Sequence, residues 1–273
     1  MPLIDPVTMS SSLTKGGAQL PTAKGKDAPS SEPTIQPIQI KPTPVAQAAR
    51  HVFPLLLASL FALQFRPLVA DPVSTMLTSL PVVALLQLAY VLVCLPAAGS
   101  QGGGASTASG KQKTGRKVRP GEKKKGMGGG AAAELVGPNA PVASILSLVL
   151  SVLAIPPLYI AFVCFGAPLY TLVAHTGLCA AHLAVLSLFP LFYVHGVDGG
   201  AWRAVGAFQA PFDEVFGGFV GAFVGAWLGA VPIPLDWDRD WQRWPVTILC
   251  GLYGGCLLGR VLGGSLFWGK RVA

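Results

Sequence analysis

Six long apolar runs dominate the sequence after residue 50. They fall at residues 51–70, 76–95, 142–165, 168–190, 212–232 and 245–268. Crossing the hydrocarbon core of a bilayer takes about 20 mainly apolar residues in a helix. Only helices and closed barrels satisfy every backbone polar group in lipid, and the alternating ten-residue segments of a barrel are absent here. The sequence therefore predicts an all-α polytopic membrane protein with six transmembrane helices.

The composition supports a membrane protein and argues against a water-soluble one. Hydrophobic residues make up 52% of the 273 residues and charged residues only 12%, whereas soluble domains carry about 25% charged residues. The net charge is nevertheless +8. A basic chain often binds nucleic acid, but here the positive charge is confined to a tail and a loop outside the apolar runs. We therefore expect no nucleic-acid partner.

The chain divides into four parts by composition. Residues 1–50 are rich in Pro, Ser and Thr without an apolar period, which predicts a disordered cytosolic tail. Residues 51–97 carry helices one and two. Residues 98–140 are rich in glycine and lysine, which is typical of a flexible basic cytosolic loop. Residues 141–273 carry helices three to six, with a luminal loop at 232–245.

The basic residues also predict how the helices are oriented. With six spans, 16 of the 20 Lys and Arg residues fall on one side of the membrane, and only Arg66, Arg239 and Arg243 fall on the other. Positive charge gathers in cytoplasmic segments, so both termini are predicted to be cytoplasmic. The basic loop either only fixes this orientation or also contacts anionic lipid headgroups.

Two glycine ladders lie in the last two runs. The members of each ladder are four residues apart and so line one face of a helix. Small residues allow two helix backbones to approach closely in lipid. The ladders therefore predict tight packing, either of the two helices on each other or of this face on another subunit. The candidate packing residues are Gly217, Gly221, Gly225, Gly229, Gly251, Gly255, Gly259 and Gly263.

Between the ladders lies a segment that we call the Asp-Trp loop, residues 232–245. Three Asp, two Arg and three Trp fall within nine of its residues. It is either an interfacial turn with a Trp belt, a binding site for a luminal partner or headgroup, or a cation site on alternating Asp residues. Neighbouring Arg residues compete for those carboxylates, which disfavours a metal. The candidate binding residues are Asp236, Trp237, Asp238, Arg239, Trp241, Gln242 and Trp244.

The segment GAWLGAVPIPLDWDRDWQRWP at 225–245, followed by a glycine-rich final helix, resembles the PIG-F family of fungal GPI-anchor biosynthesis proteins. The resemblance implies a non-catalytic subunit, without a cofactor, that binds and stabilises a GPI ethanolamine phosphate transferase. That transferase would place phosphoethanolamine on mannoses of the GPI precursor. The resemblance also implies the endoplasmic reticulum membrane, and the terminal Lys270-Arg271 is similar to a dilysine retrieval signal.

Other chemistry receives little support from the residues. Asp198 and Arg203 match part of a lipid phosphotransferase signature, but the carboxylates that complete it are missing. His175 and His182 share a helix face, and we expect a hydrogen-bonded pair inside the bundle more than a metal site or proton relay. The alternative function is a small transporter or lipid-handling protein. That would need ionisable residues near mid-membrane, for which the two His and Gln87 are the candidates.

Overall fold

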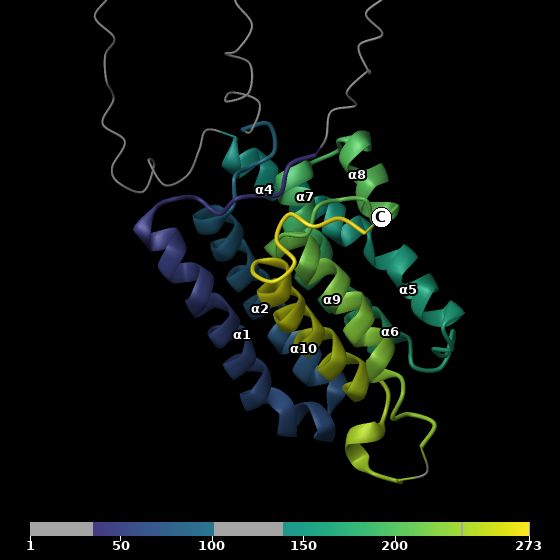
Figure 1. Cartoon of the computed structure of the whole chain (residues 1–273). Coiled ribbons are helices and arrows are strands. Elements are labelled where there is room, and N and C mark those ends of the chain that lie inside the picture. Colours follow the sequence, from purple (N-terminus) through teal and green to yellow (C-terminus); the bar gives the residue numbers. More distant parts are fainter. Residues whose placement is uncertain (1–34, 101–138, 236, 273) are drawn as a thin grey trace, which may run out of the picture. The chain divides into compact units, whose positions relative to one another are not determined.

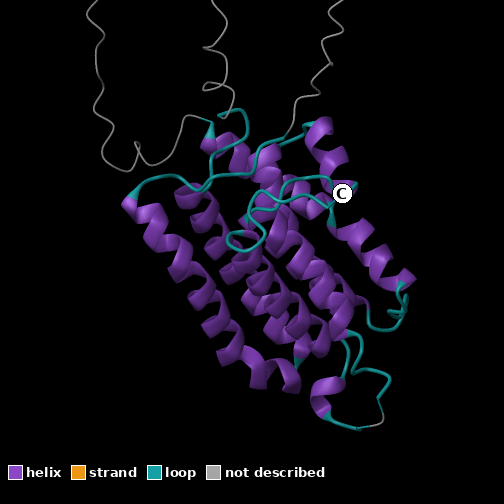
Figure 2. Cartoon of the chain, viewed as in Figure 1, coloured by secondary structure: helices purple, strands orange, loops and turns teal. Residues whose placement is uncertain are grey.

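A computed structural model describes residues 35–100, 139–235 and 237–272. The predicted tail up to residue 34, the basic loop at 101–138 and Asp236 lie outside the described residues. The described part consists of helices and loops without a strand, which confirms the predicted all-α fold (Figures 1 and 2). Its elements are α1 (Pro44–Ala70), α2 (Pro72–Cys94), α4 (Ala140–Leu153), α5 (Ile155–Cys164), α6 (Val173–Leu183), η2 (Ala184–Leu188), α7 (Phe189–His195), α8 (Gly199–Gly206), α9 (Glu214–Gly229), η3 (Asp240–Gln242) and α10 (Val246–Gly263).

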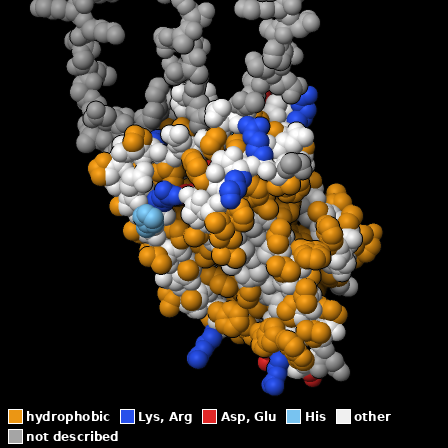
Figure 3. Space-filling model, in the orientation of Figure 1, with side chains coloured by type: hydrophobic (Ala, Val, Ile, Leu, Met, Phe, Trp, Pro, Cys, Tyr) orange, Lys and Arg blue, Asp and Glu red, His pale blue; other side chains and the backbone are white. Residues whose placement is uncertain are grey.

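Within the described residues, five segments are long and apolar enough to cross a membrane. They are α1, α2, α4 with α5, the continuous α6–η2–α7, and α10. The sixth predicted span is α9, an apolar helix of 16 residues. At 1.5 Å per residue it measures about 24 Å, somewhat less than the ~30 Å hydrocarbon core. Figure 3 shows a broad apolar surface on one face, with Lys and Arg side chains toward its two ends. The protein is a multi-pass membrane protein.

The first helix begins earlier than the sequence predicts. The disordered tail was expected to extend to residue 50, but α1 starts at Pro44. The hydroxyl of Thr43 accepts a hydrogen bond from the Ala46 amide, and Pro44 occupies the first turn, where its missing N–H costs nothing. Together they form a helix start that hydropathy alone does not detect. The helix then continues through Pro54 and Pro67 for 27 residues.

The third apolar run contains two helices. α4 ends at Leu153 and α5 begins at Ile155, with Pro156 and Pro157 directly after the break. Two successive prolines remove two backbone donors, and their rings clash with the carbonyls one turn earlier. The break turns α5 away from α4, so that α5 packs mainly against α6 (Figure 1).

The fourth apolar run contains a π-helical turn, η2, in the interior of the bundle. Pro190 has no N–H to donate to the Leu186 carbonyl four residues earlier. The Phe189 amide bonds to the Ala184 carbonyl five residues earlier, and not to the Val185 carbonyl as it would in an α-helix. Two carbonyls are therefore left without helical donors. The side-chain amide of Gln87 on α2 donates to both of them, at 3.1 Å from Val185 O and 2.9 Å from Leu186 O. Gln87 thus joins α2 to the central span.

The first and the last described residues lie at the same end of the helix bundle. The Arg271 guanidinium donates to the Ile35 carbonyl at 2.6 Å, and the Ile38 amide donates to Asp213 at 2.8 Å. The Lys41 ammonium donates to the Leu92 carbonyl near the end of α2, and burial lowers the pKa of this lysine. The Asp-Trp loop lies at the opposite end (Figure 1).

Candidate partner-binding loop and helix hairpin

The two glycine ladders face each other across the α9–α10 hairpin. A Cβ built on Gly225 would overlap the carbonyl of Gly251 and lie 2.8 Å from the Gly255 Cα. The same relation holds for Gly221 with Gly255 and Gly259, and for Gly217 with Gly259 and Gly263. At Gly229, at the loop end, the opposing atoms belong to Thr247 and Ile248.

This contact leaves no room for any side chain between the two helix backbones. The two helix backbones gain dispersion energy where they touch along the hairpin, and this replaces the hydrophobic drive that is missing in lipid. Because each ladder is covered by the other, these glycines are not available to a helix of another subunit. Any partner must bind a different surface of the chain.

Gln242 holds the Asp-Trp loop in shape. Its side chain is buried, and its amide nitrogen donates to the carbonyls of Pro232 and Leu235 at 2.8 and 2.9 Å. Its amide oxygen accepts from the Arg239 amide at 2.9 Å. A single side chain therefore joins the start, middle and end of the loop. Its role is to build the loop, so it is not itself part of an accessible contact surface.

The exposed part of the loop carries the aromatic and charged side chains. Trp237 is 54% exposed, and Asp238 and Arg239 are exposed beside it. Asp238 has φ of 46°, a left-handed conformation that Asp tolerates better than most residues. Arg243 and Asp240 form an exposed ion pair at 2.8 Å. This arrangement presents one indole ring between charges of both signs.

The other two Trp side chains of the loop face the protein more closely. Trp241 is half-buried, with its ring centroid 5.8 Å from that of Trp237. Trp244 donates from its indole nitrogen to the Thr176 hydroxyl at 3.2 Å and meets the edge of Phe162. Trp244 therefore attaches the loop to α6 and α5. Of the described candidates, Trp237, Asp238 and Arg239 are the most accessible.

We predict that Gln242→Ala loosens the loop without unfolding the bundle. Three hydrogen bonds are lost at about 0.5–1.5 kcal/mol each, so the loop opens more often while the helices keep their contacts. Hydrogen exchange of peptides from 232–243 should rise, with no change in peptides from α2. Arg243→Gln, which removes only an exposed ion pair, is the control. Equal exchange in both variants would contradict this role for Gln242.

A second polar cluster lies at the opposite end of the bundle and joins four helices. Glu214, at the start of α9, forms an ion pair with Arg50 of α1 and accepts a hydrogen bond from the Tyr90 hydroxyl of α2 at 3.2 Å. The guanidinium carbon of Arg260, on α10, lies 3.9 Å from the Tyr90 ring centroid and 4.6 Å from that of Phe53. Cation–π contacts of this kind stabilise a desolvated cation.

Arg260 is almost wholly buried, with 4% exposure, although it lies within a predicted span. Its Nε and Nη2 have no hydrogen-bond partner among the described residues. The Phe53 and Tyr90 rings lie against its guanidinium and offset part of the cost of burying its charge. The sequence pattern did not reveal this cluster, because its members come from four helices that are distant from one another in the chain.

The two intramembrane histidines do not bond to each other. His182 is buried, and its ring contacts the Tyr253 hydroxyl at 2.8 Å through Nδ1 and the Met76 carbonyl at 3.1 Å through Nε2. His175 is only half-buried and lies about two helical turns away along the same face. The expected His–His pair is therefore wrong, because a helical separation of seven residues spans about 10 Å. His182 and Gln87 bond to neighbouring helices inside the bundle.

The described residues contain no group of three or more His, Cys, Asp or Glu side chains placed to hold a metal ion. Asp198 caps α8 by accepting from the Gly200 amide at 2.9 Å. Trp202, which occupies a position of the phosphotransferase signature, donates from its indole to the Gly196 carbonyl. Both residues therefore have a local structural role at the start of α8.

Comparisons with known proteins give a consistent result. The model of the "GPI biosynthesis protein family Pig-F" matches residues 52–264. A protein of Neurospora crassa named glycosylphosphatidylinositol anchor biosynthesis protein 11 is 55% identical, over 99% of this chain and 100% of its own length. Proteins of the same name from Pyricularia oryzae and Aspergillus fumigatus are 48% and 46% identical, over 97% and 86% of this chain and 96% and 84% of their own lengths. No solved structure matches the chain.

Proposed function

The chain belongs to the Pig-F family of GPI biosynthesis proteins, and we propose that it is the non-catalytic membrane subunit of a GPI ethanolamine phosphate transferase. In this role it binds the catalytic subunit and stabilises it in the endoplasmic reticulum membrane. The names of its relatives support a part in GPI-anchor biosynthesis. The transferase partner follows from the sequence resemblance of the Asp-Trp loop.

The observation that carries the proposal is the structure of that loop. Gln242 and Trp244 fix its backbone, whereas the side chains of Trp237, Asp238 and Arg239 are exposed. Trp and Arg are the residues that most often dominate binding energy at protein interfaces. A preformed loop also loses little entropy on binding.

The remaining polar groups support a binding role over catalysis. His182, Gln87 and Glu214 contact partners inside the bundle, where they join helices. Packing between α9 and α10 uses the glycine faces completely. We therefore expect the transferase to bind away from the glycine faces, through the Asp-Trp loop and lipid-facing side chains of the helices.

We predict that the double variant Trp237→Ala with Arg239→Ala folds normally but recovers less transferase. Interface anchors of these types contribute about 2 kcal/mol, equivalent to a roughly 30-fold weaker association. The measurement is quantitative mass spectrometry of the proteins that co-purify with the tagged full chain in mild detergent. Arg66→Ala is the matched control, because Arg66 is also exposed and lies near the same end of the bundle. Unchanged transferase recovery with the double variant would contradict the loop as the anchor.

A further inference from the structure

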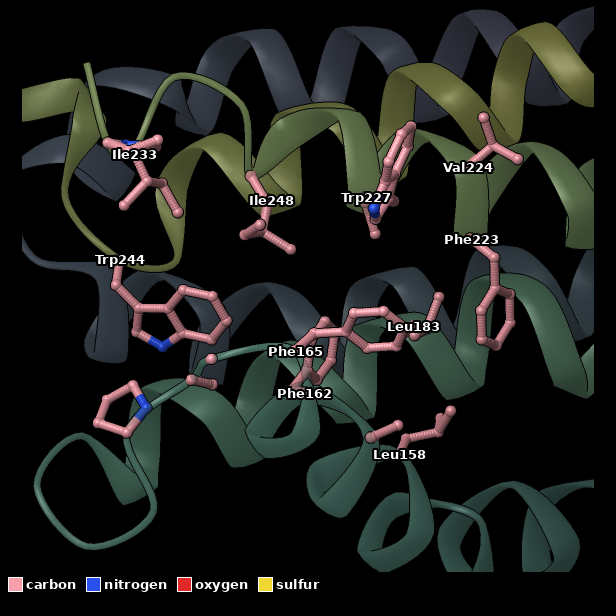
Figure 4. Close-up of a pocket in the computed structure, with 17 residues that line it drawn as sticks. Leu158, Phe162, Phe165, Leu183, Phe223, Val224, Trp227, Ile233, Trp244 and Ile248 are labelled. Carbon is pink, nitrogen blue, oxygen red and sulfur yellow. The ribbon is translucent and has the colours of Figure 1, made fainter.

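An apolar cavity opens on the side of the bundle next to the Asp-Trp loop. Its volume is about 710 Å³, within the ~300–1,000 Å³ range of small-molecule sites. Figure 4 shows its walls: Leu158 and Phe162 from α5, Phe223 and Trp227 from α9, with Trp244 toward the loop. None of the residues that line it is charged.

The cavity exists because of two features of the chain. The break at Pro156 and Pro157 directs α5 away from α4, and the loop after α5 carries Phe165 outward, where it is 80% exposed. On the other side, α9 faces α10 with its glycines and so turns Phe223 and Trp227 away from that contact. A space lined by large aromatic side chains therefore remains between α5 and α9.

The depth of the cavity matches one leaflet of a bilayer. Its lining extends along α9 from Phe223 to Ala230, which is about 10 Å at 1.5 Å per residue. Trp237, Trp241 and Trp244 lie at the loop end, and Trp side chains gather at headgroup level. From that level to the mid-plane the hydrocarbon of one leaflet is about 15 Å thick. The cavity therefore faces acyl chains and not water.

A partner helix does not fit this space. A helix about 10 Å across fills roughly 420 Å³ per turn, so the cavity holds fewer than two turns. A spanning helix is much longer, whereas an extended acyl chain is narrow enough to enter lengthwise.

We propose that this cavity binds an acyl chain of a membrane glycerophospholipid from the leaflet that faces the Asp-Trp loop. The acyl chain enters from the side between Phe165 and Trp227, and the lipid headgroup remains at the level of the Asp-Trp loop. The aromatic side chains that line the cavity hold fixed positions, so an acyl chain makes dispersion contacts with them that it does not keep with the mobile chains of a fluid bilayer. This site does not depend on the transferase, and it is separate from the exposed loop residues.

The test uses the full chain in vesicles of phosphatidylcholine that contain a trace of the same lipid with a photoreactive acyl chain. After irradiation, peptide mass spectrometry locates the adducts. We expect an excess of adducts on Phe162, Phe223 and Trp227 over Leu63 of α1, which is 81% exposed and faces bulk lipid. Adducts on the cavity residues at or below the level of Leu63 would overturn the proposal.

A second variant separates the cavity from general lipid exposure. Ala161→Phe places a ring inside the cavity from α5, and the excess of adducts on Phe223 should be lost. Ala62→Phe, on the exposed face of α1, is the matched control and should leave that excess unchanged. An excess that survives Ala161→Phe would overturn the proposal. If the purified transferase complex protects Phe223 from adducts that the chain alone acquires, a protein segment is the native occupant, and the proposal is again overturned.

Discussion

Gly255→Ala is expected to destabilise the protein strongly, whereas Gly254→Ala should leave it unchanged or slightly more stable. A Cβ on Gly255 would overlap the Gly221 carbonyl and lie 2.8 Å from the Gly225 Cα, so α9 and α10 would have to separate. Overpacking costs about 1–3 kcal/mol even where side chains can move, and here the opposing atoms are backbone. At Gly254, on the same helix, a Cβ meets no atom within 4 Å.

The two neighbouring glycines thus make a matched pair, because alanine is expected to lower the stability at Gly255 and to keep or raise it at Gly254. Alanine is about 1 kcal/mol better than glycine in a helix interior. Both variants gain this propensity, but only Gly255→Ala also suffers the backbone clash. Thermal unfolding of both purified variants in the same detergent measures the difference as a shift in Tm. Similar Tm values for the two variants would show that the ladders do not pack as described.

The second large effect is expected for Glu214→Gln. This change removes the carboxylate that pairs with Arg50 and accepts a hydrogen bond from Tyr90, against whose ring the buried Arg260 guanidinium lies. Removing one partner of a buried ion pair costs about 3–5 kcal/mol. Because the Arg50 side chain is 30% exposed, we expect a smaller cost here, about 2 kcal/mol. Asp240→Asn, which breaks the exposed pair with Arg243, should cost less than about 1 kcal/mol. Denaturation of the two variants, monitored by circular dichroism in detergent, compares these costs.

A second substitution tests whether the uncompensated charge causes the loss. Arg260→Met in the Glu214→Gln background removes the buried charge and retains a long apolar side chain, so it should restore part of the lost stability. Such coupling is expected for residues in one cluster and absent for distant ones. If Arg260→Met instead adds its own full cost to that of Glu214→Gln, the two groups do not compensate each other.

Hydropathy predicted the helical architecture well, because a lipid environment leaves few other choices. The predicted runs 76–95 and 245–268 correspond to α2 and α10, and the run 212–232 to α9. The spacing of four residues correctly placed each glycine ladder on one helix face. It left open whether the ladders met each other, since small residues suit any close helix contact equally.

The differences arise from local backbone chemistry that a hydropathy window averages away. Thr43 and Pro44 begin α1 inside a segment that looked like a disordered tail, and Pro156 and Pro157 divide the third run. The π-helical turn follows from Pro190 together with Gln87, which lies about 100 residues earlier in the chain. Such a pairing becomes visible only when the fold brings α2 beside the central span.

The candidate loop was located from composition, but composition could not separate its roles. Gln242 and Trp244 are candidate contact residues that also hold the loop in place, whereas Trp237, Asp238 and Arg239 are exposed. The acyl-chain cavity and the Arg260 cluster had no sequence signal, because their members come from helices that are distant in the chain. Asp236 lies outside the described residues, so its part in the loop stays a prediction.

The central claim is that this chain supports phosphoethanolamine transfer as a partner and not as the catalyst. The most direct measurement is to purify the tagged full chain in mild detergent, identify the proteins that accompany it, and assay each fraction for transfer of phosphoethanolamine to a GPI precursor. The account predicts that a separate transferase subunit co-purifies and that activity appears only in fractions that contain it. Activity in fractions that contain this chain alone would contradict the account.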